Sequence, residues 1–295
     1  MTTRVRAAET AERGPAAVLP RASRTKGAIP AMMAGMIRRS TALFALALIT
    51  AACGASPDPV ERPDAEVAVD TAPPLVVGAD EGDTLEPILP LLPGGVDVVA
   101  IPLQRFTTLW DDPERRGSDF LFDTQNPMGQ LSPMLIEGAE FARGDAWYEV
   151  FLPLRPNGAT AWVNERDVQI RRIDYRIEVD LSERTLRYFV DDKVKERFRV
   201  GIGTDATPTG RGRFYVWVKV YYADPYQAYG IGALGLSGFS PVLSEWPGGG
   251  RMAIHGTSNP GDRGRAVSHG CIRVYNEDMK ALLDVPLGTP VEIRA

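Results

Sequence analysis

From residue 94 onward the chain consists of short runs in which apolar and polar residues alternate, and Gly and Pro separate these runs. The segments "YRIEVDL" (175–181) and "RFYVWVKV" (213–220) carry aliphatic or aromatic side chains at every second position. In an extended chain this period of two places the apolar residues on one face, where they can pack against a core. The alternation therefore predicts a mainly β fold.

One segment near the C-terminus has the period of a helix instead. Met279, Leu282 and Leu283 form an apolar stripe at helical spacing. Asn276 is a residue type that caps helix N-termini, and Pro286 cannot continue a helix. We predict one short helix between these two residues, followed by a closing strand.

The β pattern divides at about residue 172 into two predicted domains, 94–171 and 172–295. In the first domain, "WYEVFLPLRPNGATAWV" (147–163) contains two candidate strands joined by a turn that includes Pro and Gly. This stretch resembles the bacterial SH3-like domain. We predict a small SH3-like β-barrel here, with Trp147 and Trp162 in its core, followed by a larger β-rich domain.

A long segment rich in Gly and aromatic residues, 221–250, interrupts the second domain. Connections of this length are usually functional or disordered, and the aromatic content argues against disorder. We predict that the segment is a lid over a binding site, with Tyr229 and Trp246 facing a substrate.

The N-terminal region contains a candidate export signal. Arg38 and Arg39 precede a short apolar run, and Ala51-Ala52 stand directly before Cys53. This order resembles a bacterial lipoprotein signal, in which cleavage exposes the cysteine and its thiol carries a lipid. A plain secretory signal with an incidental Cys53 is the alternative, and either signal directs the chain out of the cytoplasm.

The remaining N-terminal residues are expected to lack a fold. We predict a signal peptide over 36–53 and a Pro- and Asp-rich disordered tether over 54–93, because such a composition buries too little apolar surface. Residues 1–35 are expected to be disordered or to precede the true start at Met36. The expected location is the outer face of the cytoplasmic membrane, lipid-anchored and facing the cell wall, or secreted in the alternative.

The overall charge excludes one class of partner. A net charge of −5 and a pI near 5.3 do not fit a nucleic-acid-binding protein, which normally presents a basic face. We expect no nucleic-acid partner.

The rarest residues of the chain lie together. His255, His269 and Cys271 are three of only four His and Cys residues, and Cys271 follows His255 by 16 positions. A histidine that deprotonates a cysteine makes a nucleophile, which forms a thioester when it attacks a carbonyl. Gly270 allows the backbone N–H groups beside Cys271 to approach the oxyanion closely. No acidic residue is near either histidine in sequence, so a backbone carbonyl is a candidate to orient the ring.

Three alternative roles for these residues are open. A zinc site would use two His and one Cys, but it lacks a fourth ligand and the spacing of a known zinc motif. A buried, apolar Cys271 does not fit its small and polar neighbours. A disulfide between Cys53 and Cys271 would leave both histidines without a role.

The segments "IHG" (254–256) and "SHGCIRV" (268–274) resemble the signature of the L,D-transpeptidase (YkuD) family. The resemblance covers about residues 174–294 and includes "TPTG" (207–210), the helix after the motif and the closing "GTPVEI" (288–293). The order of tether, SH3-like domain and catalytic domain is similar to that of lipid-anchored actinobacterial members.

The resemblance implies a mechanism for the motif. Cys271 is then the nucleophile and His255 the general base, with the Gly256 carbonyl holding its ring. The loop with Ser268 and Gly270 would form the oxyanion hole, together with the N–H of Cys271. No cofactor and no metal is implied.

The resemblance also implies the substrate. Cys271 would attack the third residue of a peptidoglycan tetrapeptide stem, expel D-Ala and pass the acyl group to an amine of a neighbouring stem. His269 would support substrate or charge, and Arg273 would anchor the loop or a substrate carboxylate. Carbapenem β-lactams are the implied inhibitors. A rim of arginines is expected to suit stem carboxylates; it comprises Arg251, Arg263, Arg265 and Arg273.

Three rival functions share these residues. Water as acceptor would make an L,D-carboxypeptidase, and a protein as acceptor would make an enzyme that attaches proteins to the wall. A wall-binding module with a vestigial enzyme fold is the third, although it would have no reason to keep both histidines beside the cysteine.

Overall fold

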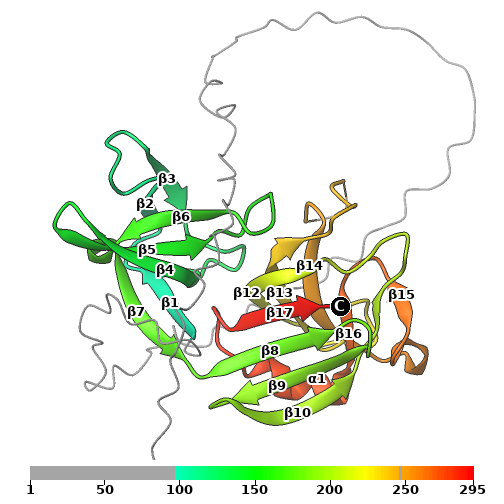
Figure 1. Ribbon diagram of the computed structural model, residues 1–295. Helices are drawn as coiled ribbons and strands as arrows, with labels where there is room; N and C mark the ends of the chain where they lie inside the picture. The colour runs from blue at the N-terminus through cyan, green and yellow to red at the C-terminus, as the bar shows by residue number, and fades with distance from the viewer. Residues whose placement is uncertain (1–96, 246–247) are drawn as a thin grey trace, which may run out of the picture. The chain divides into compact units, whose positions relative to one another are not determined.

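The computed structural model describes residues 97–245 and 248–295. The predicted signal peptide with Cys53, the tether and Trp246 lie outside the described residues. Within them the predicted mainly β fold is confirmed, with seventeen strands and one α-helix (Figure 1). None of the described helices is long and apolar enough to cross a membrane.

The N-terminal part is a seven-stranded antiparallel sheet in the order β3-β2-β6-β5-β4-β1-β7. Alternate side chains of its strands point inward, among them Leu109, Val150 and Val163, and build one core. The two strands expected around the Pro156 turn are β5 and β6, which pair antiparallel with Tyr148 opposite Val163. The bounds are β1 Asp97–Pro102, β2 Phe106–Trp110, β3 Asp119–Asp123, β4 Met134–Ala142, β5 Asp145–Phe151, β6 Thr160–Asn164 and β7 Val168–Ile173, with a 3-10 turn, η1, at Glu165–Asp167.

The C-terminal part is built on an eight-stranded sheet in the order β10-β9-β8-β17-β12-β13-β14-β16. Two neighbouring pairs, β8 with β17 and β14 with β16, are parallel, and the others are antiparallel. The sheet curves into a near-barrel around its own core (Figure 1). Its strands are β8 Tyr175–Asp180, β9 Thr185–Val190, β10 Lys193–Arg199, β12 Gly212–Tyr221, β13 Gly232–Phe239, β14 Arg251–Thr257, β16 Ile272–Tyr275 and β17 Pro290–Arg294.

Two short strands stand apart from this sheet. β11 (Ile202–Gly203) and β15 (Ala266–Ser268) pair in parallel. A 3-10 turn, η2 (Pro260–Asp262), precedes β15. The turn η2 and β15 form the connection between β14 and β16.

The predicted helix is α1, Asn276–Leu283, and its stripe of Met279, Leu282 and Leu283 is buried. The expected cap is wrong. Tyr275 is the N-cap residue and makes no side-chain capping bond, while Asn276 is the first helical residue. Its side chain is buried and reaches a neighbouring loop instead.

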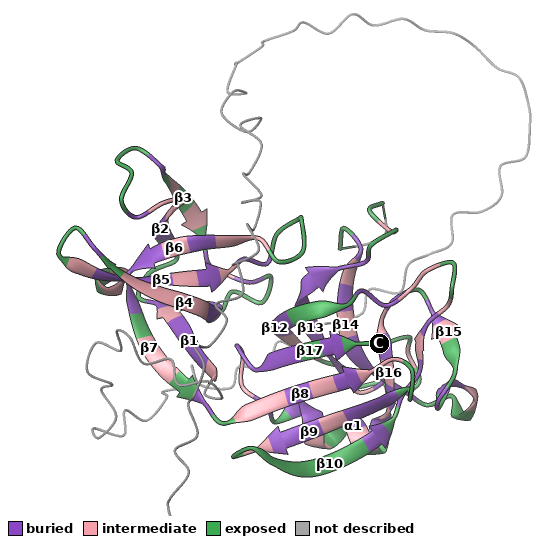
Figure 2. Ribbon diagram, in the orientation of Figure 1, coloured by how far each residue is buried: buried purple, intermediate pink, exposed green. Residues whose placement is uncertain are grey.

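The predicted lid over 221–250 is wrong in its centre. Residues 232–239 are strand β13, whose eight residues are all buried in the middle of the sheet (Figure 2). Its glycines serve close packing: a Cβ on Gly235 would lie 2.5 Å from Val218, and one on Gly238 would lie 2.2 Å from the Phe214 ring. Among the described residues of this segment, 222–231, 240–245 and 248–250 lie outside strands.

The two sheets belong to one compact unit and share a small core. Val99 and Leu135 of the first sheet pack with Tyr215 of β12. The turn between β5 and β6 adds polar contacts. Asn157 exchanges two hydrogen bonds of 2.8 Å with the backbone of Phe239, and Arg155 donates to the carbonyls of Ser240, Leu243 and Gly249.

Asn157→Ala removes both bonds to the backbone of the buried Phe239. We expect a loss of about 1–3 kcal/mol in the free energy of unfolding, the usual cost of leaving buried polar groups unsatisfied. Urea unfolding of the full chain measures it. Asn157→Asp keeps the acceptor for the Phe239 N–H but sets an oxygen against the Phe239 carbonyl, so it should not restore the wild-type stability. Equal stability of Asn157→Ala and wild type would show that the turn does not hold the second sheet.

Candidate active site

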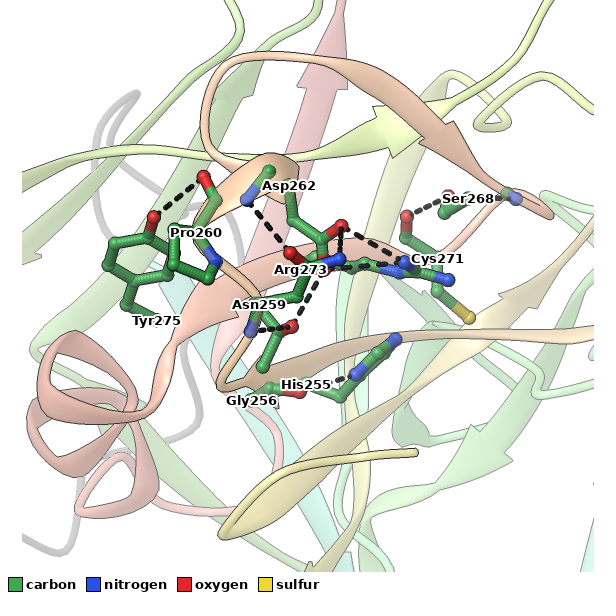
Figure 3. A network of polar contacts seen from close by, with 12 residues as sticks. His255, Gly256, Asn259, Pro260, Asp262, Ser268, Cys271, Arg273 and Tyr275 are labelled. Carbon is green, nitrogen blue, oxygen red and sulfur yellow. Dashed lines mark hydrogen bonds and ion pairs between the residues drawn. The ribbon is translucent and has the colours of Figure 1, made fainter. Parts of the chain in front are cut away.

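The parallel pair β14 and β16 brings the predicted residues together. Ile254 pairs with Ile272 and His255 with Arg273, and Cys271 stands at the entry of β16. His255 therefore lies in the strand beside the turn that carries the thiol. In Figure 3 the Cys271 sulfur and the free side of the His255 ring face the same space.

His255 is buried and held by one backbone bond. It is 4% exposed, and its Nδ1 lies 2.9 Å from the Gly256 carbonyl oxygen. Since a carbonyl only accepts, Nδ1 carries the proton and Nε2 has the free lone pair of a base. The pKa of His255 is lowered to about 4, mainly by burial and in part by the charge of Arg273, although the Gly256 carbonyl and Asp262 oppose the shift.

Cys271 is partly exposed, and its thiol is also desolvated. Burial raises its pKa above the ordinary value, whereas the backbone N–H of Ala253 and the charge of Arg273 act in the opposite direction. A lowered histidine pKa and a raised cysteine pKa favour the neutral pair, thiol and imidazole. The proton then has to move from Sγ to Nε2 as the reaction proceeds.

A tight turn presents the cysteine. Ser268 Oγ accepts from the Gly270 N–H at 3.1 Å and donates to the Cys271 carbonyl at 2.5 Å. Gly270 has a φ of +115°, which residues with a side chain rarely adopt. Ser268 and Gly270 thus fix the turn, and the Gly270 N–H is engaged by Ser268.

Arg273 is paired with an acidic residue that the sequence reasoning missed. Its Nη1 lies 3.3 Å from both carboxylate oxygens of Asp262, which is 3% exposed. Thr257 donates to the same carboxylate at 2.6 Å, and Asn259 at 3.3 Å. Asp262 is only seven residues after His255 in sequence, but its contact with Arg273 depends on the 3-10 turn η2, which the sequence did not indicate (Figure 3).

Tyr229 lies against the histidine. Its ring meets the His255 ring edge-on at 5.1 Å between centroids and stacks on Tyr222 at 6.0 Å. Burial raises the pKa of the Tyr229 phenol, and the charge of a Cys271 thiolate raises it further. The 222–231 loop therefore covers one side of the pair, while His269 is exposed on the turn.

The structure removes Arg251 from the expected arginine rim. Arg251 stacks on the Trp217 and Phe239 rings and donates to the carbonyls of Leu236 and Pro153, so it is part of the packing. Arg263 stacks on Tyr275 and pairs with Asp278. Among the four arginines, Arg273 is the one that acts on the charges of both His255 and Cys271.

The burial of His255 predicts a pH dependence of stability. The unfolded chain binds a proton at this residue below about pH 6.5, whereas the folded chain does so only near pH 4. Stability should therefore fall as the pH drops through this window. We expect wild type to lose about 3 kcal/mol more than His255→Asn between pH 7 and pH 4, in urea unfolding at each pH. Parallel curves for the two proteins would contradict the buried, neutral histidine.

Comparison with known proteins identifies the family of the domain that contains this site. The family profile of the L,D-transpeptidase catalytic domain matches residues 174–293. The protein YkuD of Bacillus licheniformis, which has a provisional L,D-transpeptidase name, is 39% identical over 122 residues, 41% of this chain and 66% of that protein. The protein YqjB of Bacillus subtilis, named in the same way, is 34% identical over 125 residues, 39% of this chain and 69% of that protein.

One solved structure is the catalytic domain of an E. faecium L,D-transpeptidase acylated by ertapenem. It is 30% identical, with a TM-score of 0.32, and the match covers 41% of this chain and 98% of that one. The chain spans 66% of the length of each of the two YkuD proteins of Bacillus that it matches. The chain belongs to the L,D-transpeptidase (YkuD) family, whose catalytic domain occupies residues 174–293.

Proposed function

We propose that the protein is a peptidoglycan L,D-transpeptidase that links the third residues of neighbouring stem peptides. The observation that carries the proposal is a buried His255 whose Nδ1 is bonded to the Gly256 carbonyl and whose ring faces the same space as the Cys271 sulfur (Figure 3). This bond leaves Nε2 as the base, and the parallel strands bring it to the side of the thiol.

The reaction has two steps. Nε2 of His255 takes the thiol proton as Sγ of Cys271 forms a bond to the stem carbonyl; the amide bond to D-Ala breaks, and the amine leaves with the proton. An amine of a second stem then gives a proton to Nε2 and attacks the thioester. The new amide forms and the thiol is restored, so no oxidant or reductant is needed.

The backbone and side chains of the turn complete the proposed site. The Cys271 N–H is the proposed hydrogen-bond donor to the oxyanion. The Gly270 N–H is a second proposed donor, once its hydrogen bond to Ser268 Oγ is broken. Arg273, fixed by Asp262, favours the thiolate as it forms. His269, exposed beside the thiol, and Tyr229 are proposed to contact the stem, and Trp246 keeps its predicted role as a lid residue.

Water or a protein amine could resolve the same thioester. We favour the stem amine because the 222–231 loop covers the dyad and Tyr229 limits access from that side. A wall-binding module with an inactive site is the less suited alternative, since a bonded base beside the thiol has no use in it.

The N-terminal predictions complete the proposal. We retain the lipid anchor at Cys53, the tether and a position at the outer face of the membrane. The seven-stranded sheet is the proposed SH3-like domain, facing the wall or supporting the catalytic domain. Carbapenems are the proposed inhibitors, because their strained carbonyl offers Cys271 the same acylation as the stem amide.

Mass spectrometry of the purified chain with a disaccharide-tetrapeptide tests the proposal. We expect a dimer that has lost one D-Ala, and no product with Cys271→Ala. Tripeptide monomer alone would indicate the carboxypeptidase. The absence of both products, with no adduct after addition of a carbapenem, would reject an activated nucleophile.

His255→Ala should slow acylation of Cys271 by about 10²- to 10⁴-fold, the usual contribution of a general base. The rate of carbapenem adduct formation measures this. His269→Ala is the control from the same turn, and it should slow the adduct far less. An equal loss for both variants would contradict the assignment of His255 as the base.

A further inference from the structure

Asn276 is a buried polar residue that the mechanism above does not use. It is 8% exposed at the first position of α1, and it does not cap that helix. A buried amide has both a donor and an acceptor to satisfy. Its partners therefore show what the residue holds.

Both partners lie on the loop that carries Tyr229. The Asn276 Oδ1 accepts from the Ile231 N–H at 3.1 Å, and its Nδ2 donates to the Pro225 carbonyl at 2.9 Å. The two bonds span most of the 222–231 loop, with Tyr229 between the two attachment points. One side chain thus ties both ends of this loop to the start of the helix.

The same amide oxygen also lies against the backbone beside the base. A Cβ at Gly256 would be 2.4 Å from Oδ1, and one at Gly230 would be 2.1 Å from it. Both distances are far below contact, so the oxygen occupies the space that two missing side chains leave. Gly230 in addition has a φ of +61°.

These contacts meet at His255. The carbonyl of Gly256 holds Nδ1, and Tyr229, directly before Gly230, covers the ring edge-on. We infer that Asn276 is a positioning residue of the active site, which locks the 222–231 loop against β14 and so fixes and shields the catalytic histidine. The inference rests on the proposed function of His255 as the base.

No shorter or purely accepting side chain has this effect. Aspartate would place an oxygen against the Pro225 carbonyl, and alanine would reach neither partner. Released from Asn276, the loop would open the ring of His255 to water. The pKa of His255, lowered mainly by burial, would then rise toward its ordinary value.

The chain offers a direct readout, because it has only two histidines. NMR titration of the histidine ring protons in the full chain reports both, and His269→Gln assigns them. We expect Asn276→Ala to raise the His255 midpoint by at least about one unit and to slow carbapenem acylation about tenfold or more. Arg273 and Asp262 act on the pKa of His255, Tyr229 contacts its ring and Cys271 lies beside it, and all four are kept in this variant.

Asn164 provides a matched control. It is also 8% exposed, donates to Asp145 at 3.1 Å and accepts from the Arg166 N–H at 3.0 Å, in the first sheet. Asn164→Ala should leave the His255 midpoint and the acylation rate unchanged. If Asn276→Ala does not fold, Asn276→Ser serves, since serine suits a helix start but cannot reach both loop partners.

The outcomes separate the inference from the proposed function. A folded Asn276 variant with the wild-type His255 midpoint and acylation rate overturns the inference. A shift equal to that of Asn164→Ala also overturns it. The titration does not depend on turnover, so a wild-type chain that forms no adduct would reject the proposed function while the midpoint still tests the lock.

Discussion

The parallel pairing of β14 with β16 is the constraint on which the rest of the site depends. Parallel neighbours need a long connection, and here it contains η2 and β15. That connection delivers Asp262 to Arg273 and the Ser268 turn to Cys271. One strand pair and the connection between its strands therefore determine the positions of the base, the thiol and the Arg273–Asp262 ion pair.

Burial gives this site its chemical character. Desolvation disfavours the imidazolium and the thiolate alike. The resting pair is thus neutral and resists water and adventitious oxidation better than a standing thiolate would. Arg273 and the Ala253 N–H favour the charge only where it develops during attack. Because the buried histidine is neutral, the free energy of unfolding is expected to fall at acidic pH.

Much of this could be predicted from local pattern. Period-two alternation indicated the strands, and the apolar stripe at 279–283 indicated the helix. The joint rarity of His and Cys indicated the candidate dyad. These signals are local because each depends on residues within one element or one motif.

The rest depends on packing between elements that are far apart in sequence. The glycines of β13 suggested a loop in the sequence. Their actual role is to leave space for the Phe214 ring and Val218, and these residues lie on another strand, β12. Asn276 suggested a cap, because nothing nearby in sequence shows that Pro225 and Ile231 come to it. The roles of Asp262 and Arg251 likewise depend on their partners in the fold, Arg273 and the Trp217 ring.

The shared core between the two sheets has a consequence for where the enzyme ends. Tyr215 is fully buried against Val99 and Leu135, and the Trp217 carbonyl accepts from Asn126 and Ser132 of the connection between β3 and β4. A fragment trimmed to the family match, 174–293, would expose this aromatic face to water and leave its carbonyl without those donors. We therefore expect that the residues of the family match do not form a complete folding unit in this chain, because part of their core is supplied by the first sheet.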